Sequence, residues 1–264
     1  MLLYKWLSMK MPELSLKLKE AKMPMSSEEY IRRTWKSAMM LSIAMLVVFF
    51  FFSGSIKVIL FFPIVFPIMF LYFLKLVDVK IEKMRKSIEK EILFAGRFLI
   101  IELESGVPIY NAFKNISKNY EAVGPFFQEI VYKVDLGTSL EDALNEVIVT
   151  VPSPNLVRIL WQILNSFKTG SNVTGSLNTV LTQIAREQQI IVKEYGRKLN
   201  PLAMFYMMMA IIVPSLGITM LSVFASFIGL NISLGFLLVI WVVLMLIQFM
   251  FLAMIKSSRP PMIV

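Results

Sequence analysis

The chain has 264 residues, of which 57% are hydrophobic and 17% are charged, and its formal net charge is +9. This balance is too apolar for a soluble domain and indicates a membrane protein with several spans. Cysteine and histidine are both absent, which excludes disulfides, thiolate or imidazole metal ligands, and any mechanism that needs a His base or a Cys nucleophile. We therefore expect no cofactor, no metal site and no enzymatic activity.

Residues 1–36 form a polar, basic segment with eight Lys or Arg against four Glu. Leucines and lysines alternate between Pro12 and Pro24, so no long helix is predicted there. A helix is expected to begin at Ser26 or Ser27, because the two glutamates that follow are favourable in a first helical turn. This helix would lead directly into an apolar segment.

Residues 37–77 are predicted to form a first pair of transmembrane helices. The first span, 37–56, carries no charge over 20 residues, about the length that crosses a ~30 Å hydrocarbon core. The second span, 58–74, contains Pro63 and Pro67, so we expect it to be kinked.

Residues 78–198 hold 15 basic and 14 acidic residues and are predicted to form a soluble, all-α domain. Glycines and prolines divide this region into six helices, which we expect to pack as an antiparallel bundle. The predicted helices are 78–105, 108–120, 125–136, 139–150, 154–169 and 172–198.

A short pattern recurs three times in this region, each time beginning at a glycine just past a predicted helix end. Gly106, Gly137 and Gly170 lie 31 and 33 residues apart, a spacing typical of helical-hairpin repeats. Glycine is favoured at this position because the backbone there is left-handed. A residue that suits a helix start follows two positions later in each copy: Pro108, Ser139 and Asn172. We interpret the three glycines mainly as helix caps, with direct contact to a partner as the less favoured alternative.

Each glycine is also followed by a small residue at offset six and an apolar residue at offset seven. Residues at these offsets lie on the helix face that begins with the apolar residue at offset three, and the small side chain allows close approach of a neighbouring helix. The pairs are Ala112 with Phe113, Ala143 with Leu144, and Ser176 with Leu177.

If successive helices run antiparallel, all three glycine turns lie at the end of the domain farthest from the bilayer. Glu104, Asp135, Glu141 and Asp142 would then cluster at this end. Solvated helix faces and acidic first turns are the simpler interpretation of such residues. The alternative is an acidic docking surface for a partner.

Residues 199–256 are free of formal charge up to residue 255, and this length predicts a second pair of spans with a turn near 229–233. Residues 257–264 would form a short tail. Lys and Arg cluster before the first span, between the second and third, and after the fourth. By the positive-inside rule, both termini, the tail and the helical domain are expected in the cytoplasm. This distribution explains most of the net charge without nucleic acid.

Several segments resemble one known family, the type II secretion system F domain, including its archaeal branch of archaellum and archaeal pilus platform proteins. The resemblance covers roughly residues 26–255. It is carried by Lys83-Met-Arg-Lys, Glu102-Leu-Glu-Ser-Gly-Val-Pro-Ile-Tyr-Asn-Ala-Phe, Val134-Asp-Leu-Gly-Thr-Ser-Leu-Glu-Asp-Ala-Leu, Arg186-Glu-Gln-Gln, Glu194-Tyr-Gly-Arg-Lys-Leu-Asn-Pro-Leu and Ile212-Val-Pro-Ser-Leu-Gly.

The resemblance implies a platform in the cell membrane on which a cytoplasmic hexameric secretion ATPase acts to move prepilins into a type IV pilus-like filament. Many family members carry two such cytoplasmic domains, and this chain has one, which favours a homodimer or pairing with a second platform subunit. The alternatives are a membrane transporter or a signalling protein with a helical cytoplasmic domain. A transporter would need ionisable groups deep in a span, and a receptor would need sensor mass outside; the sequence offers neither.

Overall fold

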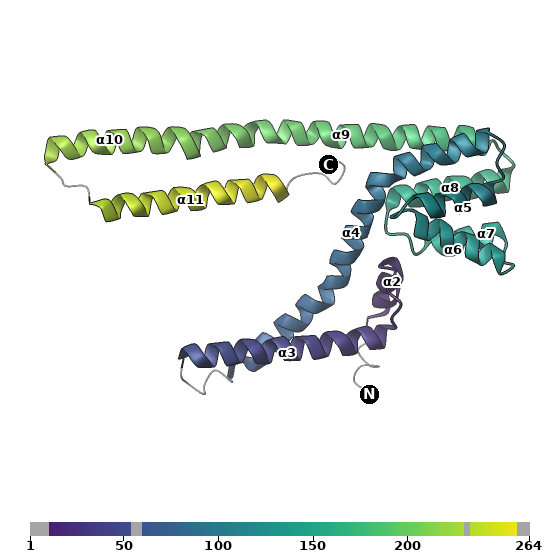
Figure 1. The fold of residues 1–264 in the computed structure, drawn as a ribbon, viewed down its shortest axis with the longest axis horizontal. Helices are drawn as coiled ribbons and strands as arrows, with labels where there is room; N and C mark the ends of the chain where they lie inside the picture. Colours follow the sequence, from purple (N-terminus) through teal and green to yellow (C-terminus); the bar gives the residue numbers. More distant parts are fainter. Residues whose placement is uncertain (1–10, 54–59, 230–232, 258–264) are drawn as a thin grey trace. The chain divides into compact units, whose positions relative to one another are not determined.

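A computed structural model describes residues 11–53, 60–229 and 233–257, and the secondary structure of these residues is entirely helical (Figure 1). The junction between the first two predicted spans, at residue 57, lies outside these residues, as do parts of the turn predicted near 229–233 and of the predicted tail. The helices are α2 (Pro12–Glu20), α3 (Ser27–Ser53), α4 (Phe62–Glu104), α5 (Ile109–Asn119), α6 (Gly124–Asp135), α7 (Leu140–Ile148), α8 (Pro154–Thr169), α9 (Val173–Met207), the π-helical turn η2 (Met208–Ile212), α10 (Val213–Ile228) and α11 (Leu234–Ser257).

Four helices of the described part are long and apolar enough to cross a membrane: Ser27–Phe51, Phe62–Glu104, Val173–Ile228 and Leu234–Met254. In the apolar 18-residue stretch of each helix, only 0% to 17% of the residues are buried inside the protein. An apolar surface of this kind is stable only against lipid or another apolar surface. The chain is therefore a multi-pass membrane protein, as its composition predicts.

The second span and the first helix of the soluble region form one continuous helix, α4, of 43 residues. At 1.5 Å per residue this helix is about 65 Å long. Pro63 lies in the first turn of this helix, where a proline leaves no hydrogen bond unmade. Pro67 lies inside the helix, where it removes one backbone donor.

The last helix of the soluble region likewise continues into the third span. Helices α9, η2 and α10 form an unbroken run from Val173 to Ile228, and Pro201 lies inside it. The π-helical turn η2 ends two residues before Pro214. A proline lacks an N–H and its ring crowds the carbonyl four residues earlier, and a widened turn relieves both problems. The boundary predicted between residues 198 and 199 thus falls within a helix.

The chain divides into two compact units, one ending at Thr182 and the other beginning at Gln183. The first contains α2 to α8 and the first turns of α9. The second contains the rest of α9, then η2, α10 and α11, and in it α11 runs back along α10 (Figure 1).

In the first unit, α5 to α8 begin and end within two residues of their predicted bounds. Their apolar faces pack against each other and against α4. Phe113 of α5 and Phe127 of α6 meet edge to face, with ring centroids 5.0 Å apart, a favoured aromatic geometry. On α4, Ile88, Ile92 and Leu99 are fully buried, which shows that this face of α4 belongs to the core.

Candidate functional site

The three glycine turns share one backbone geometry. Gly106, Gly137 and Gly170 have φ of +84°, +96° and +64°, in the left-handed region that side chains with a Cβ avoid. In each turn the residue after the glycine donates its backbone N–H to the carbonyl five positions earlier, at 3.0 to 3.1 Å. This bond is the mark of a Schellman helix end. The repeat seen in the sequence is therefore a repeat of structure.

The helix that follows each turn begins as its side chains predict, with one shift. Ser139 Oγ accepts the backbone N–H of Asp142 at 3.1 Å, and the Ser139 hydroxyl donates to Asp142 Oδ2 at 2.6 Å. Asn172 Oδ1 accepts the backbone N–H groups of Thr174 and Gly175. Pro108 is the N-cap itself, one position before the first helical residue.

The small and apolar residues of the repeat line the interior of the first unit. Ala112, Ala143, Leu144 and Leu177 are fully buried, and Phe113 is nearly so. In the third copy, Ser176 replaces alanine, and its hydroxyl lies 2.8 Å from that of Ser166 on α8. This bond satisfies a polar group at a position where the other two copies place a methyl group.

The acidic residues near the glycine turns fall into two classes. Asp135 accepts a hydrogen bond from the Tyr110 hydroxyl at 2.5 Å, which joins the first two turns and raises the pKa of Tyr110. Asp142 is held by its cap. Glu104 and Glu141 are exposed and have no ion-pair partner within the described part of the chain. Of the four predicted acidic residues, these two form neither an ion pair nor a side-chain hydrogen bond with the described residues.

Two carboxylates in the middle of α4 hold the other turns of the domain. Glu91 Oε2 accepts the backbone N–H groups of Ala122 and Val123, at the turn between α5 and α6. Glu89, which is buried, accepts from the Ser153 hydroxyl and the Asn155 amide, both at 2.6 Å, at the turn between α7 and α8. Sequence reasoning missed both roles. The sequence signal that could have revealed the role of Glu89 is its position between two isoleucines of the apolar stripe of α4.

These contacts place the turns of the domain at two different positions along α4. The turns held by Glu89 and Glu91 lie about 20 Å along the helix from its end at Glu104, at 1.5 Å per residue. The first glycine turn follows Glu104, and the Tyr110–Asp135 bond ties the second to the same level. The first two glycine turns thus lie at the end of α4 that is remote from its apolar half.

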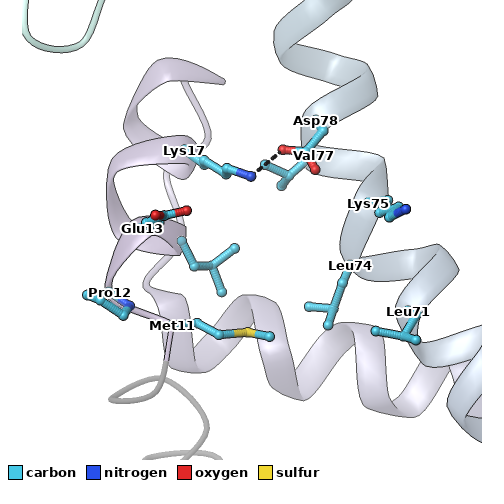
Figure 2. A pocket seen from close by; sticks show the side chains of 10 residues that line it. Met11, Pro12, Glu13, Lys17, Leu71, Leu74, Lys75, Val77 and Asp78 are labelled. Atoms are coloured by element: carbon cyan, nitrogen blue, oxygen red, sulfur yellow. Dashed lines mark ion pairs between the residues drawn. The ribbon is translucent and has the colours of Figure 1, made fainter.

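The N-terminal segment packs against the middle of α4 through the short helix α2 (Figure 2). Leu14 and Leu18 of α2 are buried in a small core with Val77 of α4. Lys17 Nζ lies 2.8 Å from Asp78 Oδ1, and this bond raises the pKa of Lys17. A cavity of about 380 Å³ lies between the two helices, and both apolar and charged side chains border it (Figure 2).

The end of α2 is attached to α6 through Lys22. Its ammonium group pairs with Glu129 and lies 4.6 Å from the centroid of the Phe126 ring. Lys22 has φ of +48° and is the one non-glycine residue with positive φ in the described ranges. A lysine in this conformation costs about 1–2 kcal/mol relative to glycine.

No group of three or more His, Cys, Asp or Glu in the described residues could hold a metal ion. The arrangement provides capped helix turns, a braced central helix and apolar spans.

A comparison with known families agrees with the repeat. The family model for the type II secretion system (T2SS), protein F, matches residues 97–221. The chain therefore contains a domain of this protein F family. The protein F match begins in α4, includes all three glycine turns, and ends inside α10. No curated protein and no solved structure gives a significant match.

Proposed function

We propose that this protein is the membrane platform of a type IV pilus-like filament, of the archaeal pilus or archaellum type. In this role it couples a cytoplasmic hexameric ATPase to the insertion of prepilins, and it has no catalytic activity of its own. The observation that carries the proposal is the continuity of α4, which joins an apolar span to the protein F domain without a break. A force on the domain would reach the bilayer through this helix.

The central segment of α4 needs support to transmit such a force. Between Asp78 and Ser87 no residue of α4 is fully buried, and Ile81 packs against the small core that contains Leu14 and Leu18 of α2. Helix α2 lies beside this part of α4. Lys17 pairs with Asp78 at the start of this part, and Lys22, just after α2, pairs with Glu129 of α6. We infer that α2 is a second strut, which lets the span and the domain move together.

The two partners would act on different parts of the chain. The exposed carboxylates Glu104 and Glu141 would receive the ATPase, since charged surface groups steer association and depend on salt. Prepilins carry apolar helices, and α10 and α11 enclose an apolar groove of about 320 Å³ lined by residues such as Gly217, Leu221 and Leu244. We propose this groove for the prepilin span.

The orientation follows from the distribution of Lys and Arg, which favours cytoplasmic termini and a cytoplasmic domain in the cell membrane. Single cysteines at Ser55 and Asn231 would then react with an impermeant reagent on intact cells, whereas cysteines at Ser139 or Ser171 would not. Labelling of Ser139 from outside would reverse this orientation. Because the chain has one protein F domain, we propose that it works as a homodimer or with a second platform subunit.

Co-purification distinguishes this function from transport or signalling. A platform should retain a secretion ATPase and prepilins when it is isolated in mild detergent. A transporter should instead show a shift in thermal unfolding with a specific solute. A solute-dependent shift without either partner would overturn the proposal.

A further inference from the structure

Helix α4 presents an exposed face with large apolar side chains on the part that lies beyond its span. Val79, Phe94 and Ile101 are 62%, 67% and 61% exposed. At 100° per residue these three fall within an arc of about 60°. The opposite face of the same helix is the buried one, so this outer face is not used by the core of the first unit.

Three cations lie in a row on the same face. Lys83, Lys90 and Arg97 are exposed and are separated by seven residues each. None of them lies within ion-pair distance of an acidic side chain in the part of the chain that the structure describes. A spacing of seven matches two turns of a helix that packs against another helix along its length. The three cations therefore repeat with the seven-residue period of a helix that pairs with another helix, and they occupy positions that would contact that second helix.

We propose that this outer face of α4, defined by Val79, Lys83, Lys90, Phe94, Arg97 and Ile101, binds an acidic amphipathic helix of another protein. The partner would place a carboxylate opposite each cation and apolar side chains against Phe94 and Ile101. Exposed aromatic and aliphatic groups between charges supply affinity, and the charges set register and partner choice. The proposal does not depend on the filament function.

Two other occupants fit the face less well. A second copy pairing through the same face would bring cation rows together, and like charges repel. An anionic bilayer would have to touch the face along its length of about 33 Å. Helix α4 continues directly from its span, and beyond Pro67 it contains no proline at which it could bend sharply onto the membrane surface.

The test uses the full chain in nanodiscs of neutral phosphatidylcholine. The probe is a fluorescent synthetic helix about four heptads long, with glutamate at each first position and leucine at each fourth. A second peptide has the same composition in scrambled order. Binding is measured by fluorescence anisotropy at about 50 and about 300 mM salt. We expect the periodic peptide to bind more tightly than the scrambled one, and more weakly at high salt.

The variant Lys83→Glu with Lys90→Glu and Arg97→Glu should weaken binding by about tenfold or more. The matched control reverses Lys114, Lys118 and Lys168, which are exposed elsewhere on the first unit, and should bind like wild type. Phe94→Ser should weaken binding at both salt concentrations, since its contribution is apolar. Equal binding of the two peptides, or equal loss in the control variant, would show general attraction to cations and overturn the proposal.

Two further readouts identify the other occupants. A dye on Ser87→Cys, beside the face, should emit alike in neutral and in phosphatidylglycerol nanodiscs; a blue shift confined to the anionic lipid would mean a membrane contact. The charge-reversed variant should sediment with the same mass as wild type. A change of oligomeric state would mean that a second copy covers this face. Either result would overturn the proposal.

Discussion

The Ser153 hydroxyl donates a hydrogen bond of 2.6 Å to Glu89 Oε1, across 64 residues of sequence. Ser153 Oγ also accepts the backbone N–H of Leu156 and so caps α8. One serine therefore begins a helix and ties it to the central helix α4. The carboxylate is buried, so its hydrogen-bond partners compensate for lost hydration.

The first prediction concerns this carboxylate. Glu89→Gln places an amide NH₂ where the Ser153 hydroxyl or the Asn155 amide donates, so one buried donor loses its acceptor. We expect a loss of about 2 kcal/mol of stability, measured as a lower midpoint of thermal unfolding of the full chain in detergent. Glu82→Gln on the same helix is the control, because Glu82 is exposed and makes only loose pairs at 3.7 and 3.9 Å. Similar midpoints for the two variants would contradict this role of Glu89.

The second prediction compares two glycines that have equal space around them. A Cβ would meet nothing within 4 Å at either Gly137 or Gly196, but only Gly137 has positive φ. Gly137→Ala should destabilise the protein by roughly 1–2 kcal/mol. Gly196→Ala should be neutral or stabilising by up to about 1 kcal/mol, since alanine is the better helix former. The midpoint of thermal unfolding should fall for Gly137→Ala and stay equal or rise for Gly196→Ala. An equal shift in both variants would mean that the positive φ of Gly137 does not determine the effect.

The sequence predicted these turns well because their determinants are local. A glycine past a helix end, followed by Ser139 or Asn172 as a cap, specifies both helices within a few residues. The positions of α5 to α8 followed from such signals. The four spans followed from long uncharged segments, which need no knowledge of packing.

The features missed by sequence reasoning depend on contacts between distant segments. Helix α2 was hidden because its leucines and lysines alternate, although Leu14 and Leu18 are also four residues apart and so share one helix face. The roles of Glu89 and Glu91 need the turns at Ser153 and Ala122 to be placed in space first. Among the predicted acidic residues, only the structure distinguishes Asp135, which is bonded to Tyr110, from the unengaged carboxylates.

The third prediction separates the side chain of Lys22 from its backbone. Lys22→Ala removes the contacts with Glu129 and Phe126 and keeps an unfavourable positive φ. Lys22→Gly removes the same contacts but relieves the backbone. We expect both variants to be less stable than wild type, with glycine the better of the two by about 1 kcal/mol. If the Lys22→Ala variant had the same midpoint of thermal unfolding as the Lys22→Gly variant, the backbone at this position would not be strained.

The fourth prediction tests the acidic docking surface. Glu104→Lys with Glu141→Lys reverses the two exposed carboxylates and leaves the Asp135 and Asp142 bonds intact. The double variant should fold like wild type but bind the partner ATPase more weakly, with most of the effect in the association rate at low salt. Glu121→Lys, an exposed charge at the other set of turns, is the control. Unchanged ATPase binding by the double variant would remove the acidic surface from the account.

The central claim is that this protein is the platform on which a filament is assembled. The most direct measurement is a count of surface filaments by electron microscopy in cells that lack the gene, with and without a copy that restores it. We predict that filaments disappear without the protein, that prepilins remain in the membrane, and that the wild-type copy restores assembly. Filaments as numerous in the deletion strain as in the parent would contradict the claim.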